Sequence, residues 1–393
     1  MPIRPRYLTE SIRSDALASH KMAFISGPRQ VGKTTLGAGL LEDSRNLLSW
    51  DDARFRRAWT RAPIEAVAER GKGPILLDEI HKDRRWKWRL KGLYDLRGRE
   101  VPILVTGSAR LDVYRRGGES LLGRYLPYRL HPFSVGESEE PPSPDEILSR
   151  TSPAYPWADL LRFGGFPEPL LGASERKAAR WSRLRQERLI REDLRDLRNV
   201  SDLEAVQVLA DLLPERVGSL LSVNALREDV GVAYATVRAW LAAFETLYLV
   251  FTVRPYARRI ARSLRAGRKL YLYDVLQIPK ERPAARQENL VALHLLKACH
   301  YWTDVALGEF DLRYVRDKEK REVDFLVTRE RRPWMMVECR SNDPAPSPNL
   351  LRFAGLLDVP LRFQLVTRTG FDREYPEHRL RVLDYERFLS GLV

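Results

Sequence analysis

Residues Gly27–Thr35 read GPRQVGKTT and fit the pattern G-x-x-x-x-G-K-[S/T] in full. A short apolar run at 21–26 (KMAFIS) precedes them, and a helical pattern at 34–41 follows. In this setting the glycines let backbone N–H groups curl around phosphate oxygens, and the helix N-terminus adds the positive end of its dipole. The motif therefore predicts a phosphate-binding loop between a strand and a helix.

We expect the whole loop to bind ATP. Its members are Gly27, Pro28, Arg29, Gln30, Val31, Gly32, Lys33, Thr34 and Thr35. Lys33 would bridge the β- and γ-phosphates, and the Thr34 hydroxyl would bind Mg²⁺. The alternative is a chance match in a Gly-rich turn, and the flanking strand and helix patterns argue against it.

A carboxylate pair follows the next apolar run, at 75–79 (ILLDE). A buried strand would deliver Asp78 and Glu79 to its carboxyl end, where open α/β sheets bind their ligands. We expect Asp78 to hold Mg²⁺ through water, and Glu79 to orient and deprotonate the attacking water. The alternative is a cap at the strand end, which would leave Glu79 without a role.

Hydroxyl side chains end the third apolar run, in the sequence Thr106-Gly107-Ser108. A hydroxyl here is positioned to contact the γ-phosphate or the nucleophilic water. We expect Ser108 to have this catalytic sensor role, since it comes one strand after the acidic pair.

The first part of the chain predicts a parallel sheet. Its apolar runs at 21–26, 73–77 and 101–105 are continuous rather than alternating, as in strands covered on both faces. The stretch 86–96 between the last two is amphipathic at helical spacing. This βαβ series favours a doubly wound α/β domain.

Composition changes at Glu137. The stretch 137–146 (ESEEPPSPDE) is acidic, rich in proline and without periodicity, which is typical of an exposed connection. Helical patterns follow at 158–162, 174–198 and 204–253. After Pro255 we expect short strands around one helix, namely strands at 269–273, 312–315, 322–327 and 334–339 and a helix at 287–298.

The chain is strongly basic. It has 393 residues and a net charge of +14, and its 67 basic residues comprise 12 Lys and 55 Arg. A preference for Arg over Lys can reflect genome composition or a hot habitat. A large positive excess also suits a polyanion, because neutralised phosphates release their counterions. Charge alone therefore leaves a nucleic acid partner open.

Two absences bear on the cell compartment. The two cysteines, Cys299 and Cys339, lie far apart without metal-ligand spacing. The first ten residues, MPIRPRYLTE, lack an apolar signal region, and no apolar run approaches the roughly 20 residues of a spanning helix. These features predict a cytoplasmic protein without a membrane partner.

The ordered motifs resemble a widespread prokaryotic group of AAA+-type ATPases that carry a C-terminal domain of unknown function. The resemblance rests on GPRQVGKTT, LLDEIHK, VTGSAR and GRYLPYRLHPFSVGE, followed by FGGFPE at 163–168, KLYLYD at 269–274, QEN at 287–289, EVDF at 322–325 and VECR at 337–340. The first two motifs are generic to P-loop ATPases, whereas the ordered set is specific.

This resemblance implies a division of the α/β chain into domains. They are a P-loop AAA+-type ATPase domain with a parallel sheet at 1–136, an acidic Pro-rich linker at 137–156, a helical lid at 157–202, a winged helix-turn-helix at 203–262 and an α/β restriction-endonuclease-like domain at 263–393.

The resemblance also implies an arginine finger among Arg110, Arg124 and Arg129. Arg124 falls on the family's Gly-Arg motif. Supplied by a neighbouring subunit, it would stabilise transition-state charge on the γ-phosphate. We therefore expect self-association into a ring or another oligomer. The alternative is a surface arginine, one of many in this chain.

Residues 222–248 have the spacing of a helix-turn-helix, with a first helix at 225–230, a turn at Gly231 and a second helix that opens at Thr236. If this element binds DNA, side chains of the second helix and of the basic segment beyond it would meet phosphates or a groove. The candidates are Tyr234, Thr236, Arg238, Arg258, Arg259 and Arg262. Winged helices also serve as protein-binding modules, and this alternative stays open.

The C-terminal part carries Glu288, Asp324 and Glu338-Cys339-Arg340. Nucleases of the restriction type use Asp…(Asp/Glu)-x-Lys, in which two carboxylates bind Mg²⁺ and the lysine stabilises the attacking hydroxide. Here Arg340 replaces that lysine, and its forked guanidinium is no substitute for a compact ammonium. Asp324 and Glu338 remain a candidate second metal site, but the pattern favours gripping DNA over cutting it.

Three functions follow as hypotheses. The leading one is an oligomeric AAA+-type protein that hydrolyses ATP and acts on DNA, as a motor at branched or recombining DNA. The first alternative is an ATP-dependent, metal-dependent DNA nuclease. The second is a nucleotide-switched regulatory protein whose C-terminal half binds protein.

Overall fold

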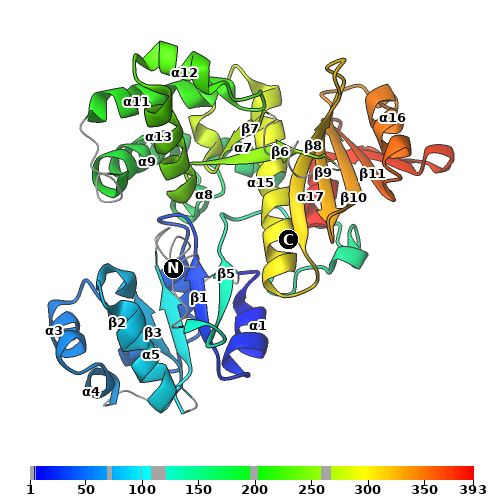
Figure 1. Ribbon diagram of the computed structural model, residues 1–393. Helices are drawn as coiled ribbons and strands as arrows, with labels where there is room; N and C mark the ends of the chain where they lie inside the picture. The colour runs from blue at the N-terminus through cyan, green and yellow to red at the C-terminus, as the bar shows by residue number, and fades with distance from the viewer. Residues whose placement is uncertain are drawn as a thin grey trace. The chain divides into compact units, whose positions relative to one another are not determined.

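The computed structural model describes residues 4, 6–68, 73–98, 100–107, 121–194, 202–257 and 267–393. The chain divides into two compact units, each shown in Figure 1. The first contains Met1–Pro132 and Ser138–Glu140, and the second contains Phe133–Glu137 and Pro141–Val393. Five residues with predicted roles lie outside the described residues, namely Ser108, Arg110, Arg258, Arg259 and Arg262.

The first unit is built on a parallel five-stranded sheet in the order β2-β3-β4-β1-β5. Its strands are β1 (Met22–Ser26), β2 (Leu47–Ser49), β3 (Ile75–Asp78), β4 (Ile103–Thr106) and β5 (Tyr125–Arg129). Every residue of β1, β3 and β4 is buried, as the continuous apolar runs predicted. The parallel α/β architecture expected from the sequence is thus present.

Helices precede β1 and connect the strands that follow it. They are α1 (Thr9–Ser11) with η1 (Ile12–Leu17), α2 (Lys33–Ala38), η2 (Ser44–Asn46), α3 (Ala53–Arg61), α4 (Pro63–Ala68), η3 (Ile80–Lys82) and α5 (Trp86–Arg97). Trp59 of α3 and Trp86 of α5 pack in one apolar cluster with Phe24, Leu77 and Val105 of the central strands. Burial of these large side chains fixes the strands whose carboxyl ends carry the predicted site residues.

Helices form the first part of the second unit. They are α7 (Trp157–Phe163), α8 (Pro167–Gly172), α9 (Glu175–Arg188) with η6 (Leu189–Leu194), α11 (Leu203–Leu212) with η7 (Leu213–Arg216), α12 (Val223–Val230) and α13 (Tyr234–Thr246), preceded by η5 (Pro144–Glu146). Gly231 separates α12 from α13 with φ 75°, a left-handed conformation that favours glycine. The helix-turn-helix spacing is present, but α13 begins at Tyr234 rather than at Thr236 because Ala233 serves as its N-cap.

An eight-stranded mixed sheet completes the second unit in the order β12-β13-β11-β10-β9-β8-β6-β7. Its strands are β6 (Val250–Pro255), β7 (Lys269–Leu272), β8 (Phe310–Arg316), β9 (Glu322–Arg329), β10 (Arg332–Cys339), β11 (Leu361–Val366), β12 (Asp372–Tyr375) and β13 (Leu380–Asp384). The accompanying helices are η8 (Val275–Gln277), α15 (Pro283–Asp304), α16 (Pro348–Leu356), η9 (Pro376–His378) and α17 (Tyr385–Ser390). The long α15 lies against β8 and β9 (Figure 1).

The second unit differs from the separate lid, winged-helix and C-terminal domains that we predicted. β6 directly follows the helix-turn-helix, yet it pairs with β8 of the C-terminal part through Arg254 and Arg313. A shared sheet joins the helix-turn-helix part and the C-terminal part by backbone hydrogen bonds, so they belong to one compact unit.

Within the described ranges, no helix is both long and apolar enough to cross a membrane.

The predicted exposed linker is in part a packed segment, which corrects its boundary at residue 137. Glu137 is only 7% exposed, and its carboxylate lies 2.5 Å from the Lys297 ammonium. The Ser134 hydroxyl also takes a 2.7 Å hydrogen bond from Lys297. A carboxylate can be buried when a cation and hydrogen bonds compensate its lost hydration, and local composition does not reveal such a distant partner.

Candidate active site

The phosphate-binding loop connects β1 to α2, as predicted. Gly27 has φ 148°, and a Cβ atom there would lie 2.2 Å from the carbonyl oxygen of Leu130. Gly32 has φ 97° at the N-cap of α2. Both positions therefore require glycine because of their left-handed conformation. Gly27 requires it also because the neighbouring backbone approaches closely.

Lys33 is held against the loop that precedes it. Its side-chain nitrogen donates hydrogen bonds of 3.0 Å to the carbonyl of Gly27 and 2.7 Å to the carbonyl of Pro28. The residue is 7% exposed, so its charge is kept at the loop instead of in bulk water. A buried ammonium at this position suits a ligand with several negative charges.

Two side chains from neighbouring elements meet at Asp78, the last residue of β3. Its Oδ1 atom accepts a 3.0 Å hydrogen bond from the Thr34 hydroxyl of α2 and a 2.6 Å bond from the Thr106 hydroxyl of β4. Asp78 and Thr106 are direct partners in the parallel register. The structure thus brings together Thr34 and Asp78, the two residues predicted to hold Mg²⁺.

Glu79 directly follows this cluster in a strained conformation. Its φ of 56° is left-handed, which is uncommon for a residue other than glycine, and its backbone N–H donates a 2.9 Å bond to the Thr106 carbonyl. The Glu79 carboxylate lies 3.6 Å from His81 Nε2 and 3.7 Å from Lys82 Nζ. The turn therefore places the carboxylates of Asp78 and Glu79 in different surroundings, as the separate roles predicted for these two residues require.

The residues present suit ATP with Mg²⁺. Mg²⁺ prefers oxygen ligands, and it is commonly bound by one or two protein groups together with phosphate oxygens. The Thr34 hydroxyl and the Asp78 carboxylate supply such oxygens beside Lys33 and the N-terminus of α2. The set can hold a nucleotide triphosphate and its metal, and Glu79 can accept a proton from water beside them.

Sequence reasoning missed Arg6, which contacts the loop, and Tyr7, which contacts the end of β5 and the residues after it. The buried Arg6 donates a 2.9 Å bond to the Val31 carbonyl inside the loop and a 2.5 Å bond to the His131 carbonyl. The Tyr7 hydroxyl contacts the Arg129 carbonyl and accepts a 2.9 Å bond from the His131 N–H. The sequence signal that could have identified them is the adjacent Arg6-Tyr7 pair, which lies in an N-terminal segment without another assignment.

Arg124 precedes β5, at the end of the sheet opposite the loop. Its carbonyl accepts a hydrogen bond from Met22, the first residue of β1, whereas the loop follows the last residue of β1. Its guanidinium forms a two-bond ion pair with Asp95 of α5, at 2.7 and 3.2 Å. Arg124 therefore lies away from the Gly27–Thr35 loop of its own chain, and its role as a finger stays a prediction about a neighbouring subunit.

The predicted nuclease-like residues gather around a lysine. Lys269 Nζ of β7 lies 2.6 Å from Glu322, 3.3 Å from Glu288 and 3.4 Å from Asp324. Burial lowers the pKa of Lys269, but these carboxylates raise it by more, so it stays above its ordinary value. The sequence pointed to Glu288 and Asp324 but did not reveal that Lys269 would lie between them.

Glu338 and Arg340 do not complete this cluster as a lysine motif would. Glu338 is only 8% exposed. Burial, together with the negative charge of Asp324, raises the pKa of its carboxyl group to about 8. Arg340 instead lies 3.4 Å from the exposed Asp343. Across the described part of the chain, no three His, Cys, Asp or Glu side chains are placed to hold a metal ion. The second metal site at Asp324 and Glu338 stays an untested prediction.

Comparison with known families divides the chain in a similar way. Residues 19–139 match the family described as AAA domain. Residues 156–275 match a domain of unknown function (DUF8612), which spans the helices of the second unit through β7. The helix-turn-helix and restriction-endonuclease-like assignments of the second unit are not tested by these matches.

Two mycobacterial proteins are similar to this chain over most of its length. The chain is 24% identical over 377 residues to the uncharacterized proteins Rv2008c of Mycobacterium tuberculosis and Mb2031c of Mycobacterium bovis, covering 94% of this chain and 80% of theirs. The similarity therefore extends across both units without supplying a function.

Two solved structures also align with the chain. One is the Aeropyrum pernix ORC1 protein in complex with DNA, at 15% identity and a TM-score of 0.30, with 74% of this chain and 94% of that chain covered. The other is the Thermotoga maritima RuvB Holliday junction branch migration motor, at 17% identity and a TM-score of 0.30, with 68% and 95% covered. TM-scores this low do not establish a shared fold.

Proposed function

We propose that this protein is an oligomeric, Mg²⁺-dependent ATPase that couples hydrolysis to work on DNA. The observation that carries the ATPase part is the convergence of Thr34, Asp78 and Thr106 beside the Gly27–Thr35 loop. The match of residues 19–139 to the AAA domain family supports the same conclusion.

Each residue of the site has a separate task in this proposal. Lys33 and the loop N–H groups bind the phosphates, while Thr34 and Asp78 hold Mg²⁺. Glu79 orients the attacking water and accepts its proton as the bond to the γ-phosphorus forms. Arg124 of a neighbouring subunit adds positive charge on the γ-phosphate as the bond to ADP breaks.

The DNA part rests on charge and on the second unit. The chain has a net charge of +14, and the α12–Gly231–α13 arrangement has helix-turn-helix spacing. Thr236 and the exposed Arg238 lie on α13, where they can reach a nucleic acid, whereas Arg258 and Arg259 lie outside the described residues. We propose branched or recombining DNA as the substrate, with the cytoplasm as the site of action.

The deciding experiment measures ATP turnover without DNA and with duplex, single-stranded and four-way DNA, each at two salt concentrations. We expect at least one DNA to stimulate turnover and higher salt to reduce that stimulation, because phosphate contacts release counterions. Glu79→Gln is the control, since it should bind ATP but not turn it over. Equal rates with all DNAs and with none would contradict the DNA function and favour the regulatory alternative.

A nuclease assay separates the remaining alternative. Labelled DNA incubated with ATP and Mg²⁺ or Mn²⁺ should stay intact, because the Lys269 ammonium already pairs with the carboxylates of Glu288, Glu322 and Asp324. Cleavage that Asp324→Ala abolishes would establish the nuclease in its place.

A further inference from the structure

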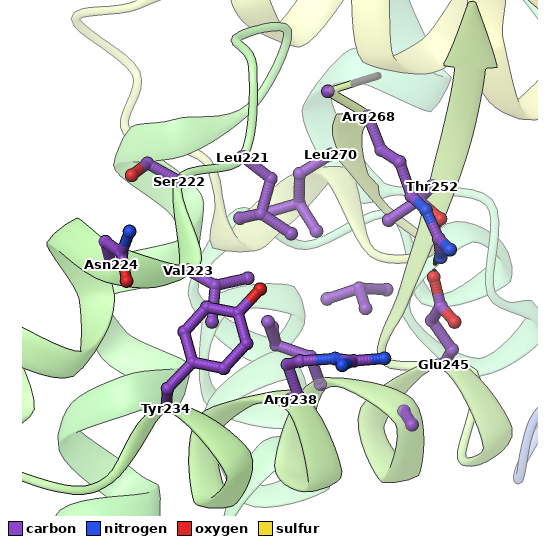
Figure 2. Close-up of a pocket in the computed structure, with 14 residues that line it drawn as sticks. Leu221, Ser222, Val223, Asn224, Tyr234, Arg238, Glu245, Thr252, Arg268 and Leu270 are labelled. Atoms are coloured by element: carbon purple, nitrogen blue, oxygen red, sulfur yellow. Dashed lines mark hydrogen bonds between the residues drawn. The ribbon is translucent and has the colours of Figure 1, made fainter. Parts of the chain in front are cut away.

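The second unit contains a pocket of about 680 Å³ between the helix-turn-helix and the strands that follow it. Figure 2 shows its walls, which are the start of α12, one face of α13, and the facing parts of β6 and β7. This volume lies within the range of about 300–1,000 Å³ that small organic ligands occupy. The pocket is separate from the ATP site, which belongs to the first unit.

One stripe of α13 forms the longest wall of this pocket. Tyr234, Arg238, Leu241 and Glu245 line it at spacings of four, three and four residues, which places them on one face of the helix. A helix that reads duplex DNA projects into a major groove about 12 Å wide. Because this face of α13 lines a hollow whose other walls include β6 and β7, it suits one small unit rather than a duplex.

The pocket combines an apolar surface with an exposed aromatic ring. Its apolar lining comes from Leu221, Val223, Leu241, Val250 and Leu270. The Tyr234 side chain at its edge remains 45% exposed, which is high for a ring of this size. A flat heteroaromatic group can stack on such a ring and cover the neighbouring aliphatic side chains.

Two arginines give the lining positive charge, and the guanidinium carbon of Arg238 lies 5.9 Å from the centroid of the Tyr234 ring. Within the described residues, neither Arg238 nor Arg268 has an ion pair, and Figure 2 shows both on the side of the pocket where Glu245 lies. Glu245 accepts a 2.5 Å hydrogen bond from Thr252 and offsets one of the two positive charges. Burial is the largest cause that lowers the pKa of nearby Arg254, and the positive charges of Arg268 and Arg313 add to it while Glu245 and Asp311 oppose it.

The geometry points to a binding site for one nucleotide of an unpaired nucleic acid strand. The base stacks on Tyr234 over the apolar lining, and the phosphate binds the guanidinium groups of Arg238 and Arg268. This inference deepens the proposed DNA function and rests on it for the source of the nucleotide. Tyr234 and Arg238 thereby act on a single strand instead of a duplex groove.

The test uses the full chain with saturating Mg²⁺ and ADP, so that the phosphate-binding loop is filled. Fluorescence anisotropy measures binding of a fluorescein-labelled, single-stranded oligothymidylate. We expect Arg238→Ala and Arg268→Ala each to weaken binding about tenfold, as loss of a charged hydrogen bond does. Glu245→Gln should tighten binding, since it removes the one negative charge among the lining residues.

Two matched variants control for general effects of charge and shape. Arg227→Ala removes a positive charge from α12, where Arg227 pairs with Glu228 outside the pocket lining. It should bind the strand nearly as well as the wild type. Tyr234→Phe keeps the ring and should bind normally, whereas Tyr234→Ala should lose about tenfold or more through lost stacking. Equal losses in Arg227→Ala and Arg238→Ala would overturn the site.

Further arms separate the possible sources of the nucleotide. Thymidine monophosphate offers the same base and phosphate and would compete for the pocket. Full displacement of the strand at a millimolar concentration of this competitor would assign the pocket to a free nucleotide instead. If the wild type binds no strand while duplex DNA stimulates ATP turnover, this inference fails and the DNA function stands. If turnover ignores DNA but strand binding depends on Arg238 and Arg268, the pocket stands and the coupling fails.

Discussion

The Thr106 hydroxyl donates a 2.6 Å hydrogen bond to the same Asp78 oxygen that accepts a 3.0 Å bond from Thr34. Thr106 is fully buried and lies beside Asp78 in the sheet, so the pairing of β3 with β4 places its hydroxyl next to the carboxylate. The hydroxyl therefore fixes the carboxylate that we propose for Mg²⁺, and Thr106 is a positioning residue for that metal.

Thr106→Val tests this role with little change in shape. We expect the Mg²⁺ concentration for half-maximal ATP turnover to rise about tenfold, because a hydrogen bond to a charged group contributes about 1.5–3 kcal/mol. Titration of Mg²⁺ at saturating ATP measures the change. Thr106→Ser should restore the wild-type requirement. An unchanged Mg²⁺ dependence in Thr106→Val would show that Asp78 needs no such support.

Local sequence patterns predicted the centre of the first unit well. The apolar runs at 21–26, 73–77 and 101–105 correspond to β1, β3 and β4, whose residues are buried on both faces. Because these strands are parallel, their carboxyl ends lie on the same edge of the sheet. The meeting of Thr34 with Asp78 therefore followed from the motifs alone.

Other parts of the fold could not be predicted in this way. β5 (YLPYR) contains Pro127, which the ladder tolerates because, among the described residues, β5 is an edge strand that pairs only with β1. Lys269 meets Asp324 across 55 positions of sequence. Such a pair depends on the strand order of the eight-stranded sheet, and no periodicity within either segment indicates it.

Arg6→Ala is expected to disturb the phosphate-binding loop from outside the site. The change leaves the buried carbonyls of Val31 and His131 without their charged donor. We expect the KM for ATP to rise several-fold and the first unit to lose about 3 kcal/mol of unfolding free energy. ATP titration and thermal unfolding measure the two effects. Arg4→Ala changes an exposed arginine two residues earlier and should do neither.

Arg124→Ala should abolish ATP turnover while nucleotide binding persists, if Arg124 acts in a neighbouring site. Its present partner, Asp95, belongs to the same subunit. Asp95→Ala therefore serves as the control that removes the pair but keeps the finger, and it should retain turnover. Fluorescent ADP binding and phosphate release measure the two properties.

A mixing experiment then tests action between subunits. Arg124→Ala and Glu79→Gln should each be inactive alone, yet mixed oligomers contain some sites with an intact Glu79 and a neighbour's intact Arg124. Partial turnover in the mixture would establish the finger in trans. Normal turnover of Arg124→Ala by itself would leave Arg124 as a surface ion pair.

His294 is expected to set the acid limit of the second unit. Its Nε2 accepts a 3.0 Å bond from the Val135 N–H, and burial lowers its pKa to about 3. The unfolded chain takes up the proton near pH 6.5, so stability is complete above that pH and falls by up to about 1.4 kcal/mol per unit as pH drops toward 3. Urea unfolding at pH 7 and pH 5 measures this loss. His294→Gln should flatten the loss even if it lowers stability at both pH values. His378→Gln, at a histidine whose side chain is 41% exposed, should leave the loss unchanged. Parallel behaviour of His294→Gln and the wild type would assign the acid limit to other groups.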